Sequence, residues 1–259
     1  MDVNRRQFLN VAAGTTAAAV VVSAEMMGQQ PSADSRRIRA IAFDGFVIFD
    51  PRFVAKRVEE VIPGKGMAFT NLWRTRQFDY SWLRTAGQQY EDFWRVTESA
   101  LNYAALSMKL SLSPGQRERL MSAYLQLPVW PDVPEALAEL RRRGTRVAFL
   151  SNLTAAMLDA CLTAAKLNGY FEPHLTTDRV RVYKPSPRSY QMGVDAFDLK
   201  RDEIAFVASA AWDAAGAKWF GYPTVWVNRP NGVMEELGAR PDLITADLSG
   251  LLDFVARRR

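Results

Sequence analysis

Five short apolar runs recur along the chain, and longer segments with apolar residues at helical spacing separate them. The runs lie at residues 39–43, 146–151, 203–208, 224–227 and 242–245. Nearly continuous apolar runs that alternate with amphipathic helices are typical of parallel strands in a sheet covered by helices on both faces. The pattern therefore predicts an α/β fold with a doubly wound, mainly parallel, Rossmann-like sheet.

The gap between the first and second runs is far longer than one crossover connection needs. It holds about ninety residues with little β character. Helical patterns cover residues 51–62, 68–86, 90–108 and 117–127, and Ser113 with Gln116 forms a capping-box signature. We therefore predict a helical cap subdomain over residues 51–128, inserted after the first strand of a core formed by residues 37–50 and 129–259. Such a cap lies over the carboxyl ends of the strands, where open α/β sheets bind ligands.

The core carries its own helix boundaries. Gly144 and Gly221 each follow an amphipathic segment and are expected to end a helix. Ser186 followed by Pro187 is typical of an N-cap and the first residue of a helix.

The first 24 residues differ from the rest of the chain. Arg5 and Arg6 precede a stretch of small apolar residues that ends in Val22-Ser23-Ala24, a plausible cleavage site. This order is similar to a twin-arginine export signal. The alternative, an uncleaved membrane helix, is less favoured because the apolar run at 11–24 is shorter than the roughly 20 residues of a span. We expect the export machinery to recognise residues 1–24, residues 25–36 to form a linker, and the protein to be periplasmic.

Composition and charge narrow the possible partners. The chain is 48% apolar and 24% charged, with a formal net charge of +5, as in an ordinary globular protein with a full core. The arginine runs at 141–143 and 257–259 are typical of solvated charge, and no nucleic-acid motif is present. We expect no nucleic-acid partner, whereas a mildly basic surface favours a small anionic substrate.

The chain has one cysteine, Cys161, and one histidine, His174. A single cysteine excludes an intrachain disulfide, and its helical spacing with Leu158 and Leu162 predicts a place in the core. A lone histidine without a cysteine cluster argues against a zinc site, so His174 is interpreted as structural. We expect no metal and no cofactor.

Polar residues stand at or just beyond the ends of the predicted strands. They are Asp44, the pair Ser151-Asn152, Lys184 and Asp213. Loops at the carboxyl ends of parallel strands converge in space. This set favours nucleophilic catalysis by a carboxylate: Asp44 attacks, Lys184 keeps it ionised and oriented, and Ser151-Asn152 binds oxygens or a leaving group.

Each of these residues also has a purely structural interpretation. Asp44 can cap the following turn, Ser151-Asn152 can cap the helix that starts near Thr154, Lys184 can be a solvated loop residue, and Asp213 can be an N-cap. Taken singly, the last three favour that interpretation. Their order on successive strand ends favours a shared site.

From Arg39 to Phe254 the sequence resembles the haloacid dehalogenase superfamily, and within it the type II (L-2-haloacid) dehalogenases. The stretches that carry the resemblance are "LWRTRQFDYSWLR", "VYKPSPRSY" and "AWDAAGAKWFGYPTVWVNR". It implies that Asp44 displaces halide from the α-carbon of a small 2-haloacid and forms an ester that water hydrolyses. It also implies a metal-independent enzyme and a homodimer.

The resemblance assigns roles to further residues. Arg74 and Asn152 match halide contacts, while Ser151 and Tyr190 match residues around the substrate carboxylate and the nucleophile. Lys184 and Asp213 match the charged pair behind Asp44. Phe46 and Trp212 are expected to bind substrate.

Phosphatases of the superfamily carry a second aspartate two residues after the nucleophile, and usually paired late acids that help to bind magnesium. Here Phe46 holds the first position and Asp213 stands alone in the late loop. A halide leaves without a proton, so a dehalogenase needs neither the acid nor the metal.

The sequence departs from the type II pattern in two loops. The family's Tyr-Gly-Thr after the nucleophile is replaced by Phe46-Val47-Ile48, and Ala208 and Ala210 stand where the family has serine and asparagine, with Ser209 between them. These losses are expected to affect ester hydrolysis more than the displacement step. Two alternatives therefore stay open: an exported hydrolase of another small ester or phosphate, and a periplasmic anion-binding protein that has lost turnover.

Overall fold

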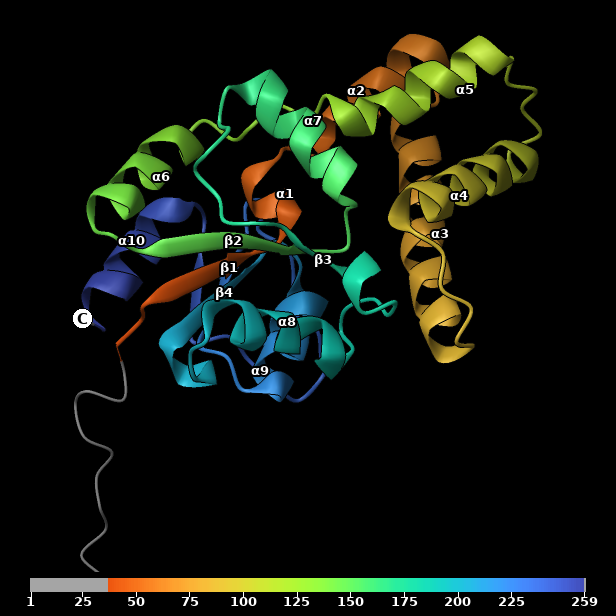
Figure 1. Ribbon diagram of the computed structural model, residues 1–259. Helices are drawn as coiled ribbons and strands as arrows, with labels where there is room; N and C mark the ends of the chain where they lie inside the picture. The colour runs from red at the N-terminus through yellow and green to blue at the C-terminus, as the bar shows by residue number, and fades with distance from the viewer. Residues whose placement is uncertain (1–36, 259) are drawn as a thin grey trace, which may run out of the picture. The chain divides into compact units, whose positions relative to one another are not determined.

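A parallel sheet forms the centre of the computed structural model, which describes residues 37–258 (Figure 1). The strand order is β3-β2-β1-β4-β5-β6, and every neighbouring pair is parallel. The strands are β1 (Ala40–Phe43), β2 (Arg146–Ser151), β3 (Leu175–Thr176), β4 (Ile204–Ala208), β5 (Thr224–Val227) and β6 (Leu243–Thr245). The predicted fold class is confirmed. The predicted export signal and linker at residues 1–36 lie outside the described residues.

Five of these strands coincide with the five apolar runs to within one residue at each end. The sixth, β3, was not predicted. It has only two residues, Leu175 and Thr176, which pair with the end of β2. Two residues cannot show a period, so their strand character depends on the neighbouring strand.

Alternation along the strands divides the core between the two faces of the sheet. In β1, Ile41 and Phe43 belong to one apolar cluster, and Ala40 and Ala42 belong to the other. The larger side chains face α6, α7 and α10, while the alanines face α8 and α9 (Figure 1). The helices around the core are α1 (Gly45–Ile48), α6 (Val133–Arg142), α7 (Ala155–Ala165), α8 (Pro187–Phe197), α9 (Ala211–Phe220) and α10 (Leu248–Ala256).

Helices fill the segment that was predicted as a cap. They are α2 (Arg52–Val61), α3 (Gly66–Ala86), α4 (Phe93–Ser107), α5 (Pro114–Met121) and the 3-10 turn η2 (Ser122–Leu125). The predicted capping box is present, because Ser113 and Gln116 exchange side-chain and backbone hydrogen bonds at the start of α5. Phe69 and Trp73 of α3 pack with α4 in an apolar cluster that continues into the core. The exact division at residues 51 and 128 stays a prediction.

Local signals explain several helix ends. Gly221 ends α9 with a φ of +102°, and Gly144, with a φ of +65°, follows the end of α6. Pro187 opens α8 after Ser186, although the Ser186 side chain makes no capping hydrogen bond. In each case the glycine or proline provides a backbone geometry that most residues adopt at a cost.

Two structural interpretations from the sequence are wrong. Asp213 is not the N-cap of α9, because Ala210 holds that position and Asp213 is the third helical residue. Ser151-Asn152 does not cap α7 either, since Thr154 is the N-cap and accepts from the Met157 amide. The side chains of Asp213 and of Ser151-Asn152 therefore do not serve as helix caps.

Cys161 is a free, fully buried thiol on α7, which confirms its predicted place in the core. No helix among residues 37–258 is long and apolar enough to cross a membrane.

Candidate active site

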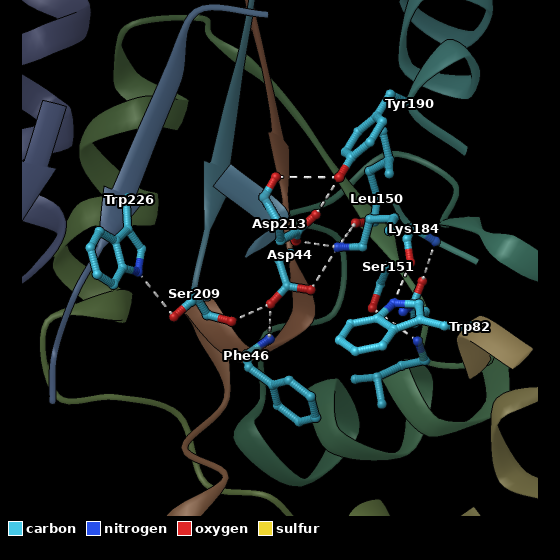
Figure 2. Close-up of polar contacts among 12 residues, drawn as sticks. Asp44, Phe46, Trp82, Leu150, Ser151, Lys184, Tyr190, Ser209, Asp213 and Trp226 are labelled. Atoms are coloured by element: carbon cyan, nitrogen blue, oxygen red, sulfur yellow. Dashed lines mark hydrogen bonds and ion pairs between the residues drawn. The ribbon is translucent and has the colours of Figure 1, made fainter. Parts of the chain in front are cut away.

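The polar residues predicted at the strand ends lie together at the carboxyl edge of the sheet (Figure 2). Asp44 follows β1, Ser151 ends β2, and Lys184 lies in the loop before α8. Asp213 lies in the first turn of α9, which follows β4. Parallel strands therefore deliver side chains from four distant parts of the sequence to one place.

Asp44 is both a helix cap and the centre of a polar network. Its Oδ2 atom accepts hydrogen bonds from the Phe46 amide at 3.1 Å and from Ser209 Oγ at 2.6 Å, and its Oδ1 atom accepts one from Lys184 Nζ at 2.8 Å. The residue is 7% exposed. The capping role proposed as an alternative is therefore present together with the ion pair, and the two are compatible.

Gly45 lets the chain after Asp44 pass close to β2. A Cβ atom at this position would lie 2.7 Å from Leu153 Cδ1 and 3.0 Å from Ser151 Oγ. Real Cβ atoms essentially never approach other atoms at the first of these distances. The glycine therefore allows the turn that aims Asp44 at the cavity to pack against the end of β2.

Lys184 is fully buried, which corrects the interpretation as a solvated loop lysine. Its Nζ atom donates to Asp44 Oδ1, to Asp213 Oδ2 at 2.6 Å and to the Leu150 carbonyl at 3.2 Å. These acceptors use all three ammonium protons. Burial disfavours the charged amine, but the carboxylates of Asp213 and Asp44 outweigh it and raise the pKa of Lys184.

Asp213 is held between Lys184 and Tyr190. The Tyr190 hydroxyl donates to Asp213 Oδ1 at 2.7 Å. Burial raises the pKa of Asp213 to about 6, in spite of the opposing effect of the Lys184 ammonium. An acid with this pKa changes its protonation state near neutral pH, as a general base for proton transfer requires.

Tyr190 is placed differently from the expectation drawn from the resemblance. It is fully buried behind Asp213, and it does not line the cavity described below. Its ring packs against Phe206 and Phe220 on the α8–α9 side of the sheet. Tyr190 therefore positions Asp213 and does not reach a substrate in the cavity.

Ser151 and Asn152 are buried residues at the end of β2. Ser151 Oγ accepts from the Leu153 amide at 3.0 Å, and Asn152 Oδ1 accepts from the Lys184 amide at 3.2 Å. Both residues line the cavity. The Ser151 hydroxyl proton and the Asn152 Nδ2 group make no hydrogen bond with another residue of the described chain, so they are available to a ligand.

A cavity of about 480 Å³ opens above Asp44 between cap and core. Asp44, Ser151, Asn152, Ser209 and Asp213 are among its polar lining residues. The aromatic side chains around it are Phe46, Phe78, Trp82, Phe93, Trp130 and Trp212. Phe46 and Trp212, which are expected to bind substrate, both line the cavity. The Trp82 indole of α3 also donates to the Lys184 carbonyl at 3.2 Å, which ties the cap to the catalytic loop.

Three guanidinium groups line this cavity, and two of them are already paired. Arg52 pairs with Asp50 at 2.7 Å, and Arg229 pairs with Asp132 at 2.9 Å. Arg74 on α3 lines the cavity, is half-buried and forms no hydrogen bond or ion pair with any residue of the described chain. Arg74 is therefore the cavity cation that is free to bind an anion.

Sequence reasoning missed some residues of the site. Ser209 was noted only as a residue between two alanines, yet it donates directly to Asp44. Its position at the end of β4, beside β1 in the sheet, was the available signal. Phe78 and Trp82 gave no such signal, because aromatic residues on amphipathic helices usually belong to the core. Trp130 lies in the loop before α6, where no pattern marks it.

His174 stands apart from this site. Its Nε2 atom lies 2.9 Å from Asp159 Oδ1, and its ring packs against Phe149. Within residues 37–258 no three His, Cys, Asp or Glu side chains are grouped so as to hold a metal ion.

The arrangement provides the parts of a nucleophilic displacement. A carboxylate paired with a buried ammonium group faces a cavity that also contains a free guanidinium group. A group that attacks and a cation that receives a departing anion are thus in the same apolar enclosure, where electrostatic interactions are strong.

A family model for haloacid dehalogenase-like hydrolases matches residues 27–221. The chain belongs to this family. An (S)-2-haloacid dehalogenase from Pseudomonas sp. strain YL is 41% identical over 218 residues, which cover 84% of this chain and 94% of the relative. This likeness places the chain among the (S)-2-haloacid dehalogenases of the family and confirms the resemblance to the type II enzymes.

Solved structures of haloacid dehalogenases agree with the fold. One L-2-haloacid dehalogenase has a TM-score of 0.83 and 38% identity, with 85% of this chain and 99% of the other covered. Another, from Xanthobacter autotrophicus with chloropropionic acid covalently bound, has a TM-score of 0.78 and 31% identity, with 85% and 98% covered.

Proposed function

We propose that the protein is a hydrolytic dehalogenase of small 2-haloacids that works through an ester on Asp44. The observation that carries this proposal is the position of Asp44: it lies at the floor of an enclosed cavity, is paired with buried Lys184, and shares the cavity with unpaired Arg74. The covalent chloropropionate complex of the Xanthobacter relative supports the same chemistry.

In the first half-reaction a carboxylate oxygen of Asp44 attacks the α-carbon of the substrate. The new C–O bond forms as the carbon–halogen bond breaks, and the halide leaves with the bonding electrons. Arg74 and the Asn152 amide receive the halide, and Ser151 binds the substrate carboxylate. Groups that are already positioned to stabilise the developing negative charge lower the activation barrier, because the site does not have to reorganise during the reaction.

In the second half-reaction water attacks the carbonyl carbon of the Asp44 ester. Asp213 accepts the water proton, and the C–O bond to Asp44 breaks to release a 2-hydroxyacid. Lys184 lies between the two carboxylates and can donate a proton to the departing alkoxide, then recover one from Asp213. One water is consumed, and one halide and one proton are released.

The aromatic lining suits the first step. Phe46, Trp130 and Trp212 restrict water around the nucleophile, and a dehydrated carboxylate is a stronger nucleophile. Phe46 stands where a phosphatase of this superfamily carries its proton donor, so the site offers no acid to an oxygen leaving group at that position.

The decisive experiment follows halide release and intact protein mass after wild type and Asp44→Asn are incubated with L-2-chloropropionate. We expect wild type to release halide catalytically. The Asp44→Asn variant, whose amide preserves the side-chain shape, should not release halide at that rate. The matched control is Asn102→Ala, at an exposed position of α4 that does not line the cavity. Release that does not depend on Asp44, or magnesium-dependent phosphate release in its place, would contradict the proposal. A melting temperature that lactate raises, together with no turnover of any substrate, would indicate a binding protein.

We also propose that residues 1–24 direct export through the twin-arginine pathway to the periplasm. The paired Arg5-Arg6 and the small apolar stretch that follows support this. Replacement of both arginines by lysine should leave the protein in the cytoplasm at its full mass. Unchanged periplasmic recovery of that variant would refute the proposal.

We further propose a homodimer, on the resemblance to type II dehalogenases alone. Light scattering coupled to size exclusion measures the molar mass directly. A value near 29.1 kDa for the full chain, rather than twice that, would show a monomer.

A further inference from the structure

The two oxygens of Asp44 are not equivalent. Oδ2 accepts two hydrogen bonds, from the Ser209 hydroxyl at 2.6 Å and from the Phe46 amide at 3.1 Å. Oδ1 accepts one, from Lys184 Nζ at 2.8 Å. Figure 2 shows Ser209 and the Phe46 amide on one oxygen and Lys184 on the other.

This asymmetry selects the oxygen that attacks. A carboxylate oxygen has two lone pairs in its plane, so two donors occupy those of Oδ2 while one lone pair of Oδ1 stays free. Attack requires a lone pair directed at the α-carbon. Oδ1 is therefore the nucleophilic atom, and Oδ2 becomes the carbonyl oxygen of the ester.

We infer that the Ser209 hydroxyl and the Phe46 amide form the oxyanion hole for hydrolysis of the Asp44 ester. This inference rests on the proposed function. When water attacks the ester carbon, the carbonyl electrons move onto Oδ2, and the two donors already point at that atom. The C–Oδ1 bond then breaks as the electrons return, and Oδ1 leaves with the product beside Lys184.

Both donors are fixed before the reaction starts, as an oxyanion hole requires. Ser209 follows β4, which pairs with β1 immediately before Asp44. The Trp226 indole on β5 donates to the Ser209 carbonyl at 3.3 Å, so two neighbouring strands hold this residue. The Phe46 amide is fixed by the backbone turn that Asp44 caps.

Ser209 also supplies a hydrogen-bond donor to Asp44 in a chain that lacks several polar groups of the type II pattern. Ile48 ends the segment in which the type II enzymes have a threonine, and Ala208 and Ala210 lack the polar groups that the family has there. The donor to Asp44 comes instead from the residue between the two alanines. Hydrolysis of the ester therefore depends on Ser209 in this chain.

The test separates the two half-reactions in wild type, Ser209→Ala, Ser209→Thr and the surface control Ser107→Ala. Ser107 is exposed on α4. Rapid quenching with L-2-chloropropionate gives the halide burst, and intact mass gives the amount of ester. For Ser209→Ala we expect a burst of one halide per chain at a rate within about threefold of wild type. The ester should then decay about 10²–10³-fold more slowly, the usual effect of losing one such donor.

Ser209→Thr keeps the hydroxyl and should restore ester decay, whereas a role in packing alone would not distinguish threonine from alanine in this way. The full burst in Ser209→Ala also shows that the variant folds. If Ser209→Ala slows the halide burst and the ester decay equally, or leaves the ester decay unchanged, the inference is overturned. Turnover by wild type would still support the proposed function in that case. Absence of both halide and ester in wild type would overturn the proposed function and this inference with it.

Discussion

Lys184 Nζ lies 2.6 Å from Asp213 Oδ2, and both side chains are removed from solvent. The same ammonium contacts Asp44 on its other side. One cation thus stabilises two carboxylates that would otherwise repel each other in a buried space. The nucleophile of the first half-reaction and the base of the second depend on this single side chain.

Lys184→Met removes that cation at similar side-chain length. Two buried carboxylates are left without their ion-pair partner, so we expect the free energy of unfolding at neutral pH to fall by about 3–5 kcal/mol. Urea denaturation followed by circular dichroism measures the change. Lys218→Met is the matched control, because Lys218 pairs with Asp242 at a partly exposed site, where an ion pair contributes about 1 kcal/mol or less. Equal losses in the two variants would contradict the role of Lys184.

The pKa of Asp213, raised by burial to about 6, sets the expected pH dependence of ester hydrolysis. Only the ionised form accepts a proton from water, so the decay rate should fall as pH drops. The midpoint should lie below about 6, because the esterified Asp44 no longer adds the negative charge that helps to raise the pKa of Asp213 in the free enzyme. Single-turnover decay of the preformed ester, measured on both sides of that pH, gives the profile. Asp213→Asn should slow decay at every pH and remove this midpoint. An unchanged midpoint in that variant would assign the titration to another group.

Arg74→Ala removes the unpaired cation of the cavity and should slow the displacement step by about 10²–10³-fold, as loss of a group that stabilises developing charge does. Halide inhibition of turnover should weaken at the same time. The control is Arg84→Ala on the same helix, because Arg84 donates to the Gln89 carbonyl and does not line the cavity. Burst kinetics and chloride titrations measure both effects. A similar loss in the two variants would show that the net charge of the cap, rather than Arg74, is what matters.

The sequence predicted the sheet and the residues at its edge for a simple reason. Apolar strands are local in sequence, and parallel strands carry their following residues to one edge. Asp44, Ser151 and Asp213 could therefore be placed together without any knowledge of their contacts. Lys184 follows none of the five predicted strands, so its place among them came from the resemblance of its Tyr-Lys-Pro motif. The two-residue strand β3 could not be predicted, because it exists only through its pairing with β2.

The details that were missed depend on side-chain direction. Tyr190 lies on the face of α8 that contacts the sheet, so it meets Asp213 from behind and not from the cavity. Ser209 follows β4 and donates to Asp44 at the end of the neighbouring strand β1, and no pattern along the chain reports that direction. Trp82 and Trp130 line the cavity through contacts between segments that are distant in sequence.

Small 2-haloacids are alkylating agents, and the group in proteins that they modify most readily is the cysteine thiolate. Here the one thiol of the chain is fully buried, and burial raises the pKa of Cys161 to about 11. At neutral pH it is uncharged and out of reach of a dissolved haloacid. The burial of Cys161 thus protects the protein from alkylation by its own substrates.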